Sequence, residues 1–427
     1  MGSFKEIVNT ISNPTILFTS VLIIFPFVFP PTDWFEKWHR KLGLHHLWGT
    51  KAIIIAMVGM IAFFVYGLGD YNFQKIVLKP DNVPISGMIF LVVYFTWLAM
   101  NQAYKNDERL DAGQKPDEFY EAPNDKVLVW PDLVYVELIS LIIMSAFLLV
   151  WSIGLPAPIE EPANPTESPN PAKAPWYFLG LQEMLVYFDP WMAGVVLPSL
   201  IIVALMAMPY IDRSPENSGF YSYKRRRLAI SLYMFGWLVL WQLLIVVGTV
   251  LRGPNWNFFG PFEYWDVHKL EALTNISLSE IIYIKFLNTG LPESILLREI
   301  WGILLTLGYF LILPPLLAKT VLKDMYDRLG VARYSIFIVL IITALTLPIK
   351  MYLRWIFNLK YIIFNLHLIF VFLFLQTICA FLKKQYLLRN HRQLKRTLEF
   401  FVNRLYSSTL VTTAIFFFIW VFYQKPK

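Results

Sequence analysis

Cysteine is almost absent from the sequence, and acidic and basic residues are scarce. The single cysteine, Cys379, excludes a disulfide within the chain and any metal site built from several cysteines. No CxxCH motif is present for covalent haem attachment. Only 16% of the 427 residues are charged, whereas soluble domains carry about a quarter charged residues. With 57% hydrophobic residues, this composition indicates that lipid is the solvent of the chain.

A continuous basic patch is also missing, although the net charge is +7. The basic residues lie between apolar runs, so we expect no nucleic acid as a partner. The opening residues, MGSFKEIVNTISNP, lack a basic segment followed by an uninterrupted apolar run and a cleavage site. We therefore expect the first apolar run to remain in the mature protein.

Apolar runs long enough to cross a bilayer are abundant, since a spanning helix needs about 20 mostly apolar residues. The sequence predicts an all-α, polytopic transmembrane helix bundle with about ten spans. They lie near residues 15–30, 52–69, 84–102, 132–154, 190–209, 228–251, 299–318, 335–349, 361–382 and 407–423. The first run is short and contains Pro26, so an interfacial or re-entrant segment is the alternative there.

Lys and Arg alternate between successive loops, as the positive-inside rule requires. Loops 31–51, 103–131, 210–227, 319–334 and 383–406 hold 24 of the 37 basic residues. These loops are expected on the inner side, and the segment 383–406 resembles an amphipathic helix on that surface. The long connections 155–189 and 252–298, rich in Pro, Trp and Phe, are then expected on the outer side.

Three motifs follow one another in a fixed order: WPDLVYVELISL, then EPANP at 161–165, then APWYF at 174–178 before the next span. Together they resemble the C-terminal half of cytochrome b, which is the separate chain subunit IV in cytochrome bf complexes. Residues 126–251 match its order of spans and loops. In that family, an outer loop carries a short Pro-Glu-Trp-Tyr helix that lines the quinol-oxidation pocket. Residues 252–354 resemble the extended tails of some bacterial members.

The resemblance implies three regions: an N-terminal extension (1–110), a subunit-IV-like region (111–255) and a C-terminal extension (256–427). It implies a haem-free subunit, inactive alone, of a bacterial quinol:cytochrome c oxidoreductase of the bc type. Expected partners are a haem-bearing cytochrome b N-terminal chain, a Rieske-type iron–sulfur protein, cytochrome c subunits and membrane lipid, in a dimeric complex. The expected location is a bacterial cytoplasmic or intracellular energy-conserving membrane, with the APWY loop on the outer, positive side.

One residue departs from the family pattern, because Pro175 occupies the position of the glutamate that takes a quinol proton. Two other functions therefore stay open. One is a non-catalytic membrane anchor for electron carriers. The other is a secondary transporter, which is disfavoured because no repeated pair of broken helices frames a substrate site.

Oxidation of a quinol needs an apolar slot, a hydrogen-bonding group, a proton acceptor and nearby redox centres. The resemblance assigns quinol binding to Pro175, Trp176, Tyr177 and Phe178, with the phenol of Tyr177 at the mouth of the pocket. An interfacial aromatic anchor is the alternative for these rings. Haem b and the iron–sulfur cluster are expected on partner chains.

Glu183 is the nearest carboxylate downstream of Pro175 and is the candidate proton acceptor. If residues 175–184 form one α-helix, Glu183 lies about 20° from the face of Trp176 and about 120° from Tyr177. The alternative is a carboxylate that ties the segment to Lys173 or to a neighbouring chain. The same outer connection contains three other candidate acceptors: Glu160, Glu161 and Asp189.

Glu137, near the inner end of the span 132–154, is a candidate for an inner-face quinone site or a proton path, because ionisable groups in lipid are costly. Its alternative is a side chain that reaches back to the membrane surface. Of the six histidines, only His367 falls within an expected span, so paired axial ligands for a haem are missing. We expect no metal on this chain.

Overall fold

The computed structural model describes residues 2–116, 119, 128–156, 162, 164–166, 169–212, 222–270 and 274–363. The described chain is built almost entirely from helices, with a single pair of very short strands. It divides into two compact units. The first comprises Met1–Val186 and Ser214–Ala272, and the second comprises Tyr187–Arg213 and Leu273–Lys427.

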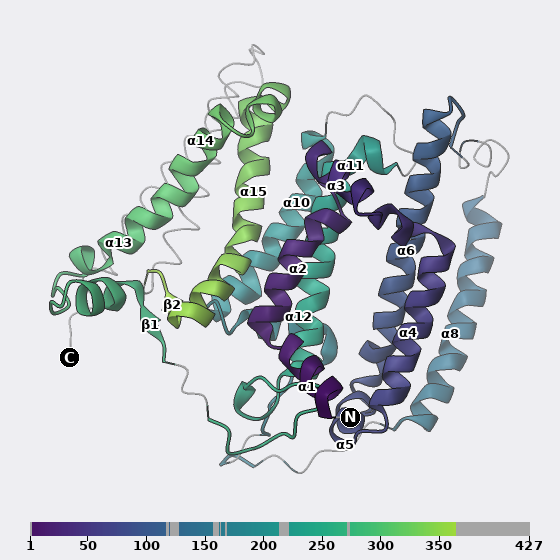
Figure 1. Cartoon of the computed structure of the whole chain (residues 1–427), viewed down its shortest axis with the longest axis horizontal. Helices are drawn as coiled ribbons and strands as arrows, with labels where there is room; N and C mark the ends of the chain where they lie inside the picture. The colour runs from purple at the N-terminus through teal and green to yellow at the C-terminus, as the bar shows by residue number, and fades with distance from the viewer. Residues whose placement is uncertain are drawn as a thin grey trace. The chain divides into compact units, whose positions relative to one another are not determined.

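The first unit is a bundle of long apolar helices joined by short amphipathic ones (Figure 1). Its N-terminal part contains α1 (Gly2–Ile11), α2 (Pro14–Val28), α3 (Asp33–Lys41), η1 (Leu44–Trp48), α4 (Thr50–Gly67), α5 (Tyr71–Val77), α6 (Val83–Asp111), η2 (Val129–Leu133) and α8 (Val134–Gly154). Its later part contains η3 (Trp176–Phe178), α9 (Leu179–Met184), α11 (Tyr223–Met234), η5 (Phe235–Gln242), α12 (Leu243–Val246), η6 (Val247–Leu251) and η7 (Pro254–Trp256).

The chain bends by 73° between α1 and α2, just before the first apolar run. The bend lies at Asn13, whose side chain accepts a hydrogen bond from the backbone N–H of Thr15 at 3.1 Å and caps α2. Pro14 occupies the first helical turn, where its missing N–H has no partner to lose. Pro26 lies inside α2, yet the sharp bend is at the cap and not at this proline.

One end of the first unit gathers the basic loops. The hydroxyl of Tyr223, which starts α11, donates to the carbonyl oxygen of Pro30 at the end of α2. Nearby, the ammonium group of Lys224 donates to the carboxylate of Asp111 at the end of α6 at 2.8 Å. Residues 222–227 and the described parts of loops 31–51 and 103–131 therefore lie at the same end of this unit, as their charge predicted.

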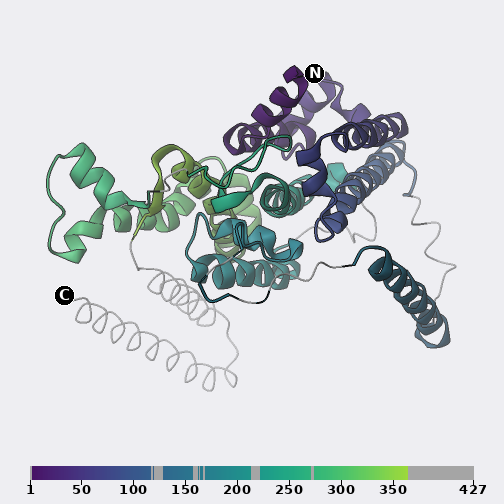
Figure 2. The same cartoon turned by 90° about the horizontal axis from the view of Figure 1, so that it is seen from below.

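The opposite end of the first unit holds the N-terminal helix and the loop after η6. Lys5 of α1 pairs with Asp70, and the backbone N–H of Phe262 donates to the side chain of Asn9 at 3.0 Å. Figure 2 views the bundle from this end. Helix α2 therefore connects one end of the bundle to the other, and whether the first run spans the membrane or is interfacial or re-entrant stays a prediction.

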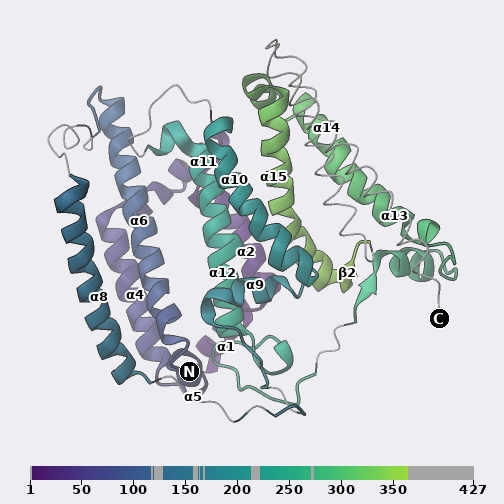
Figure 3. The same ribbon diagram turned by 180° about the vertical axis from the view of Figure 1, so that it is seen from behind.

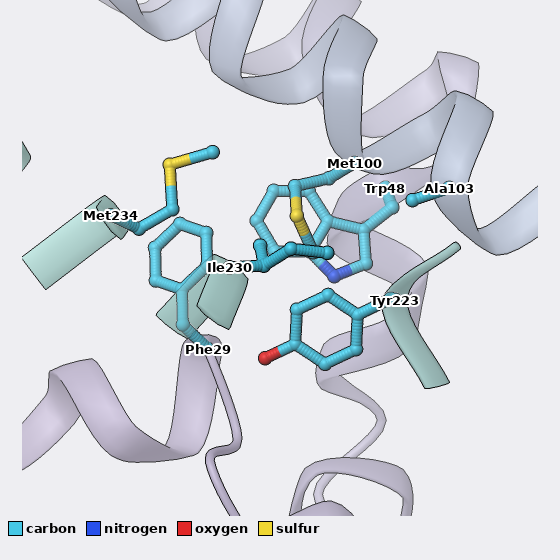
Figure 4. Packing of buried hydrophobic residues seen from close by; sticks show 7 residues of the cluster. All are labelled: Phe29, Trp48, Met100, Ala103, Tyr223, Ile230 and Met234. Carbon is cyan, nitrogen blue, oxygen red and sulfur yellow. The ribbon is translucent and has the colours of Figure 1, made fainter. Parts of the chain in front are cut away.

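A buried cluster joins the N-terminal helices to the 223–251 span (Figure 4). Aromatic rings from the end of α2 and from η1 contact side chains of α6 and α11. The cluster consists of Phe29, Trp48, Met100, Ala103, Tyr223, Ile230 and Met234. Half of the most apolar stretch of Tyr223–Leu251 is buried, so we call Tyr223–Leu251 the central span of the unit.

Seven of the described helices are long and apolar enough to cross a membrane, and the number is eight if the bent pair α1–α2 is counted as one span. They correspond to the first eight expected spans, and the all-α polytopic fold is confirmed. None of the residues of helix α8 is buried. Glu137 is exposed in the first turn of α8. There the positive end of the helix dipole stabilises a carboxylate.

The second unit contains the remaining spans and the two strands. Its elements are η4 (Met192–Val196), α10 (Leu197–Ile211), β1 (Ile276–Ser277), η8 (Glu280–Phe286), α13 (Ile295–Leu307), η9 (Gly308–Ile312), α14 (Leu313–Lys319), α15 (Lys323–Phe357) and β2 (Leu359–Tyr361). The strands pair in parallel. A cluster of Ala318, Tyr334, Ile338 and Ile342 holds α14 against α15.

Several expectations fall beyond the described residues. They concern the span 407–423, the amphipathic segment 383–406, and the residues Cys379, His367 and His391. Of the expected span 361–382, the structure describes only residues 361–363, and Tyr361 ends strand β2.

Candidate functional site

The aromatic segment APWYF forms a short turn that exposes its rings. Pro175 precedes the 3₁₀ turn η3, and its carbonyl oxygen accepts a hydrogen bond from the N–H of Phe178 at 2.8 Å. The ring centroids of Trp176 and Tyr177 lie 5.6 Å apart, and those of Tyr177 and Phe178 lie 4.7 Å apart. Tyr177 and Phe178 are each about half exposed, at 50% and 51%. The three rings therefore form one continuous surface.

The helix that follows, α9, is packed closely against the central span (Figure 3). Two glycines allow this approach. A Cβ atom at Gly248 would lie 3.3 Å from both the Cβ and the carbonyl oxygen of Leu179, and one at Gly180 would lie 3.2 Å from Ile245. Because Leu179 is also buried, α9 presents one face to η6 and α12 and leaves the aromatic turn at its outer edge.

Glu183 lies on the buried face of α9 and pairs with Arg252 at the end of η6. The guanidinium donates from Nε to Oε2 at 2.9 Å and from Nη2 to Oε1 at 2.6 Å, so both carboxylate oxygens are engaged. The side chains are 0% and 4% exposed. The remaining terminal nitrogen of Arg252 donates to the carbonyl oxygen of Trp256. The Cζ atom of the same guanidinium group lies 3.6 Å from the ring centre of Phe258. The pair is thus buried, bidentate and enclosed by the following loop.

The chain that enters the aromatic turn is fixed by Gln182, the neighbour of Glu183. Its side-chain oxygen accepts from the N–H of Ala174, and its side-chain nitrogen donates to the carbonyl of Ala172, both at 2.8 Å. This double hydrogen bond closes residues 172–182 into a loop. The helix α9 therefore holds the segment on both sides of Pro175.

Lys173 extends from the same segment toward the central span. Its ammonium group donates to the carbonyl oxygen of Thr249 at 2.8 Å and lies 5.0 Å from the ring centre of Trp265. Burial and the neighbouring positive charges of Lys79 and Arg252 lower the pKa of Lys173 to about 7, against the weaker opposite influence of Glu183. This lysine is therefore close to its titration midpoint at neutral pH.

The second outer connection completes the scaffold. Asn170 and Asn255 form a paired contact, in which the side chain of Asn170 donates at 3.0 Å and the backbone N–H of Asn255 donates in return at 2.6 Å. Asn255 has a φ of 56°, in the left-handed region where asparagine is tolerated better than most residues. The described parts of the two connections 155–189 and 252–298 in this unit thus meet at one end, as the charge pattern predicted.

The structure brings the quinol-binding candidates Pro175, Trp176, Tyr177 and Phe178 together in one turn. Residues 175–184 do not form one α-helix, because η3 is a 3₁₀ turn and α9 starts at Leu179. The face relation expected between Trp176 and Glu183 therefore does not hold. The role of Glu183 as proton acceptor stays a prediction, as do its alternative ties to Lys173 or to a neighbouring chain; within this chain its carboxylate pairs with Arg252.

The other candidate carboxylates lie elsewhere. Glu137 is on α8, Asp189 belongs to the second unit, and Glu160 and Glu161 lie outside the described residues. Sequence reasoning missed Arg252, although an arginine directly after a long apolar span was a visible signal. It also missed the asparagine pair, for which the sequence offers no comparable signal.

Metal ligands do not gather anywhere in the described part of the chain, since no three His, Cys, Asp or Glu side chains come together there. His39 is fully buried, but both ring nitrogens already have partners. Nδ1 lies 2.7 Å from the carbonyl oxygen of Phe27, and Nε2 lies 3.1 Å from the hydroxyl of Tyr104. Both ring nitrogens of His39 are therefore already engaged within the chain.

The long apolar helices define a polytopic, all-helical membrane protein. Residues 162–260 match the family described as cytochrome b (C-terminal)/b6/petD. The resemblance indicated by EPANP and APWYF is thereby confirmed, and this segment contains the whole aromatic turn, Glu183 and Arg252.

Two curated relatives have the same name, menaquinol:cytochrome c reductase cytochrome c subunit. The protein of Geobacillus thermodenitrificans is 30% identical over 123 residues, which cover 27% of this chain and 49% of the relative. The protein of Bacillus subtilis (strain 168) is 28% identical over 125 residues, with coverages of 27% and 48%. The chain thus spans about half the length of the curated relatives it matches. No solved structure matches this chain.

Proposed function

We propose that this chain is a haem-free membrane subunit of a bc-type quinol:cytochrome c oxidoreductase and completes its outer-face quinol-oxidation pocket. The observation that carries the proposal is the exposed aromatic surface of Trp176, Tyr177 and Phe178, held by a buried polar scaffold. Rings that are half exposed on an isolated chain suit a pocket whose other wall comes from a partner. The similarity to menaquinol:cytochrome c reductase subunits supports the same assignment.

The remaining parts of the site come from other chains. A cytochrome b N-terminal subunit carries the b haems, a Rieske-type protein carries the iron–sulfur cluster, and cytochrome c subunits pass electrons on. The assembly is a dimer in a bacterial energy-conserving membrane, with the aromatic turn on the positive side. The chain is inactive alone because quinol oxidation needs those one-electron acceptors.

Within the pocket, the residues of this chain bind and orient the quinol. Trp176 and Phe178 offer aromatic faces against which a quinol ring can stack. The phenol of Tyr177 forms a hydrogen bond with a quinol hydroxyl and fixes the direction in which its proton leaves. Two electrons pass to the redox centres of the partner chains, and two protons leave toward the outer side. Pro175 cannot accept either proton.

A non-catalytic anchor is the second candidate, and Pro175 is the specific observation that favours it. In that function the aromatic turn contacts a partner or the lipid headgroups, and no quinol enters. The phenol of Tyr177 separates the two candidates, because its hydroxyl matters to bound quinol and not to an aromatic anchor.

The test replaces Tyr177 by Phe in the purified, assembled complex. Loss of one hydrogen bond of about 1 kcal/mol in the transition state lowers the quinol-oxidation rate roughly fivefold or more, with assembly intact. The matched control is Tyr264→Phe, which removes another exposed tyrosine hydroxyl (72% exposed) in the loop after η6. An unchanged rate in Tyr177→Phe would favour the anchor.

A further inference from the structure

The Glu183–Arg252 ion pair is deeply buried, and it joins two segments that are 69 positions apart. One partner lies on α9, five residues after Phe178. The other begins the loop that carries Asn255. The pair therefore lies where the aromatic turn, the central span and the second outer connection meet.

We propose that Glu183 and Arg252 are positioning residues, which fix the aromatic turn against the loop 252–270 and do not exchange protons with the quinol. This inference rests on the proposed function of the turn. Both oxygens of Glu183 already accept hydrogen bonds from one guanidinium, and the carboxylate has no exposed surface. To take a proton it would have to leave a buried cation without its partner, which is strongly unfavourable.

The surroundings of the pair transmit its position to the turn. Gln182 precedes Glu183 in α9 and closes the 172–182 loop through Ala172 and Ala174. Arg252 holds the carbonyl of Trp256, next to Asn255, which pairs with Asn170. Moving either partner would therefore change both chain segments that enter and frame the turn.

The geometry also determines which substitutions are informative. Removing one partner leaves an unpaired buried group, whereas replacing both by apolar residues of similar length removes both charges together. A positioning pair can be replaced in this way, because packing of α9 on Gly248 and Ile245 remains. A proton acceptor cannot be replaced by an apolar pair.

The experiment compares Glu183→Gln, Arg252→Met and the double variant Glu183→Leu/Arg252→Met in the assembled complex. The single variants should raise KM for quinol about tenfold and leave the acid limb of the pH–rate profile in place. The double variant should regain a KM for quinol within about threefold of that of the parent complex. The control Glu6→Gln changes an exposed carboxylate of α1 and should alter none of these values.

Suppose instead that the double variant assembles but keeps the raised KM of Glu183→Gln and loses the acid limb of the pH–rate profile. This result would overturn the proposal and identify Glu183 as the acceptor. If the double variant does not assemble, hydrogen exchange of Glu183→Gln decides. Faster exchange at residues 169–178 supports positioning, and parental exchange with a lost acid limb contradicts it. This measurement is independent of the proposed function, because hydrogen exchange measures the local opening of the aromatic turn even in a complex that oxidises no quinol.

Discussion

At the scale of single residues, Lys173 is a buried lysine whose pKa is lowered into the neutral range. Its pKa falls to about 7 in the folded chain, whereas an unfolded lysine titrates near 10.5. Between these values the unfolded state binds more protons than the folded state, so stability rises with pH. The cost of burying the ammonium group is therefore fully present below pH 7 and disappears as the pH approaches 10.5.

Lys173→Met should remove this pH dependence. In the parent complex, segment 169–178 should open less readily at pH 9 than at pH 6.5, and in the variant the two opening free energies should agree. Hydrogen exchange corrected for the intrinsic amide rates measures both, with the exposed Lys37→Met as control. A parent segment that opens equally readily at both pH values would contradict the lowered pKa.

The residues of the aromatic turn could be predicted from the sequence, but their supports could not. Trp176 and Tyr177 belong to a local motif whose order along the chain is visible. Glu183 was a candidate, yet its partner Arg252 is 69 positions away and no local pattern connects them. Burial of a charged pair depends on which helices pack together, and only the folded chain determines that.

At the scale of elements, the close contact of α9 with the central span determines where the aromatic turn lies. Gly248→Val should push α9 outward, because a Cβ at this position already lies 3.3 Å from the backbone oxygen of Leu179. We expect a destabilisation of about 1–3 kcal/mol, typical of overpacking, together with a lower quinol-oxidation rate. The melting temperature and turnover of the complex provide the measurement.

Gly236→Val is the matched control for this substitution. It lies in the same span, and a Cβ there would meet no other atom within 4 Å. If both variants melt like the parent complex, the close approach of α9 does not contribute to the stability of the unit.

The spans themselves were predictable because length and apolar content are nearly sufficient to define them. Residues 52–69 and 84–102 correspond closely to α4 and α6. The bend before the first run was harder to locate, since Pro26 is the visible helix breaker, whereas the chain bends at the Asn13 cap and α2 continues through Pro26. A helix inside the membrane tolerates proline when neighbours compensate for the lost hydrogen bond.

At the scale of the whole molecule, the N-terminal helices share a core with the family segment. Phe29 and Trp48 pack against Tyr223 and Met234, so the added helices surround the central span and are part of one folded unit. The charge pattern predicted which loops lie together in this unit, because it depends on topology alone. It could not predict this shared core, which depends on side-chain packing.

The central claim is that quinol contacts the aromatic turn, and a photoreactive quinone analogue tests it most directly. When the purified complex is illuminated with this probe, we expect a labelled peptide of this chain that contains residues 176–178. An excess of the natural quinol should prevent the labelling. Label confined to partner chains, or to segments of this chain other than the aromatic turn, would contradict the account.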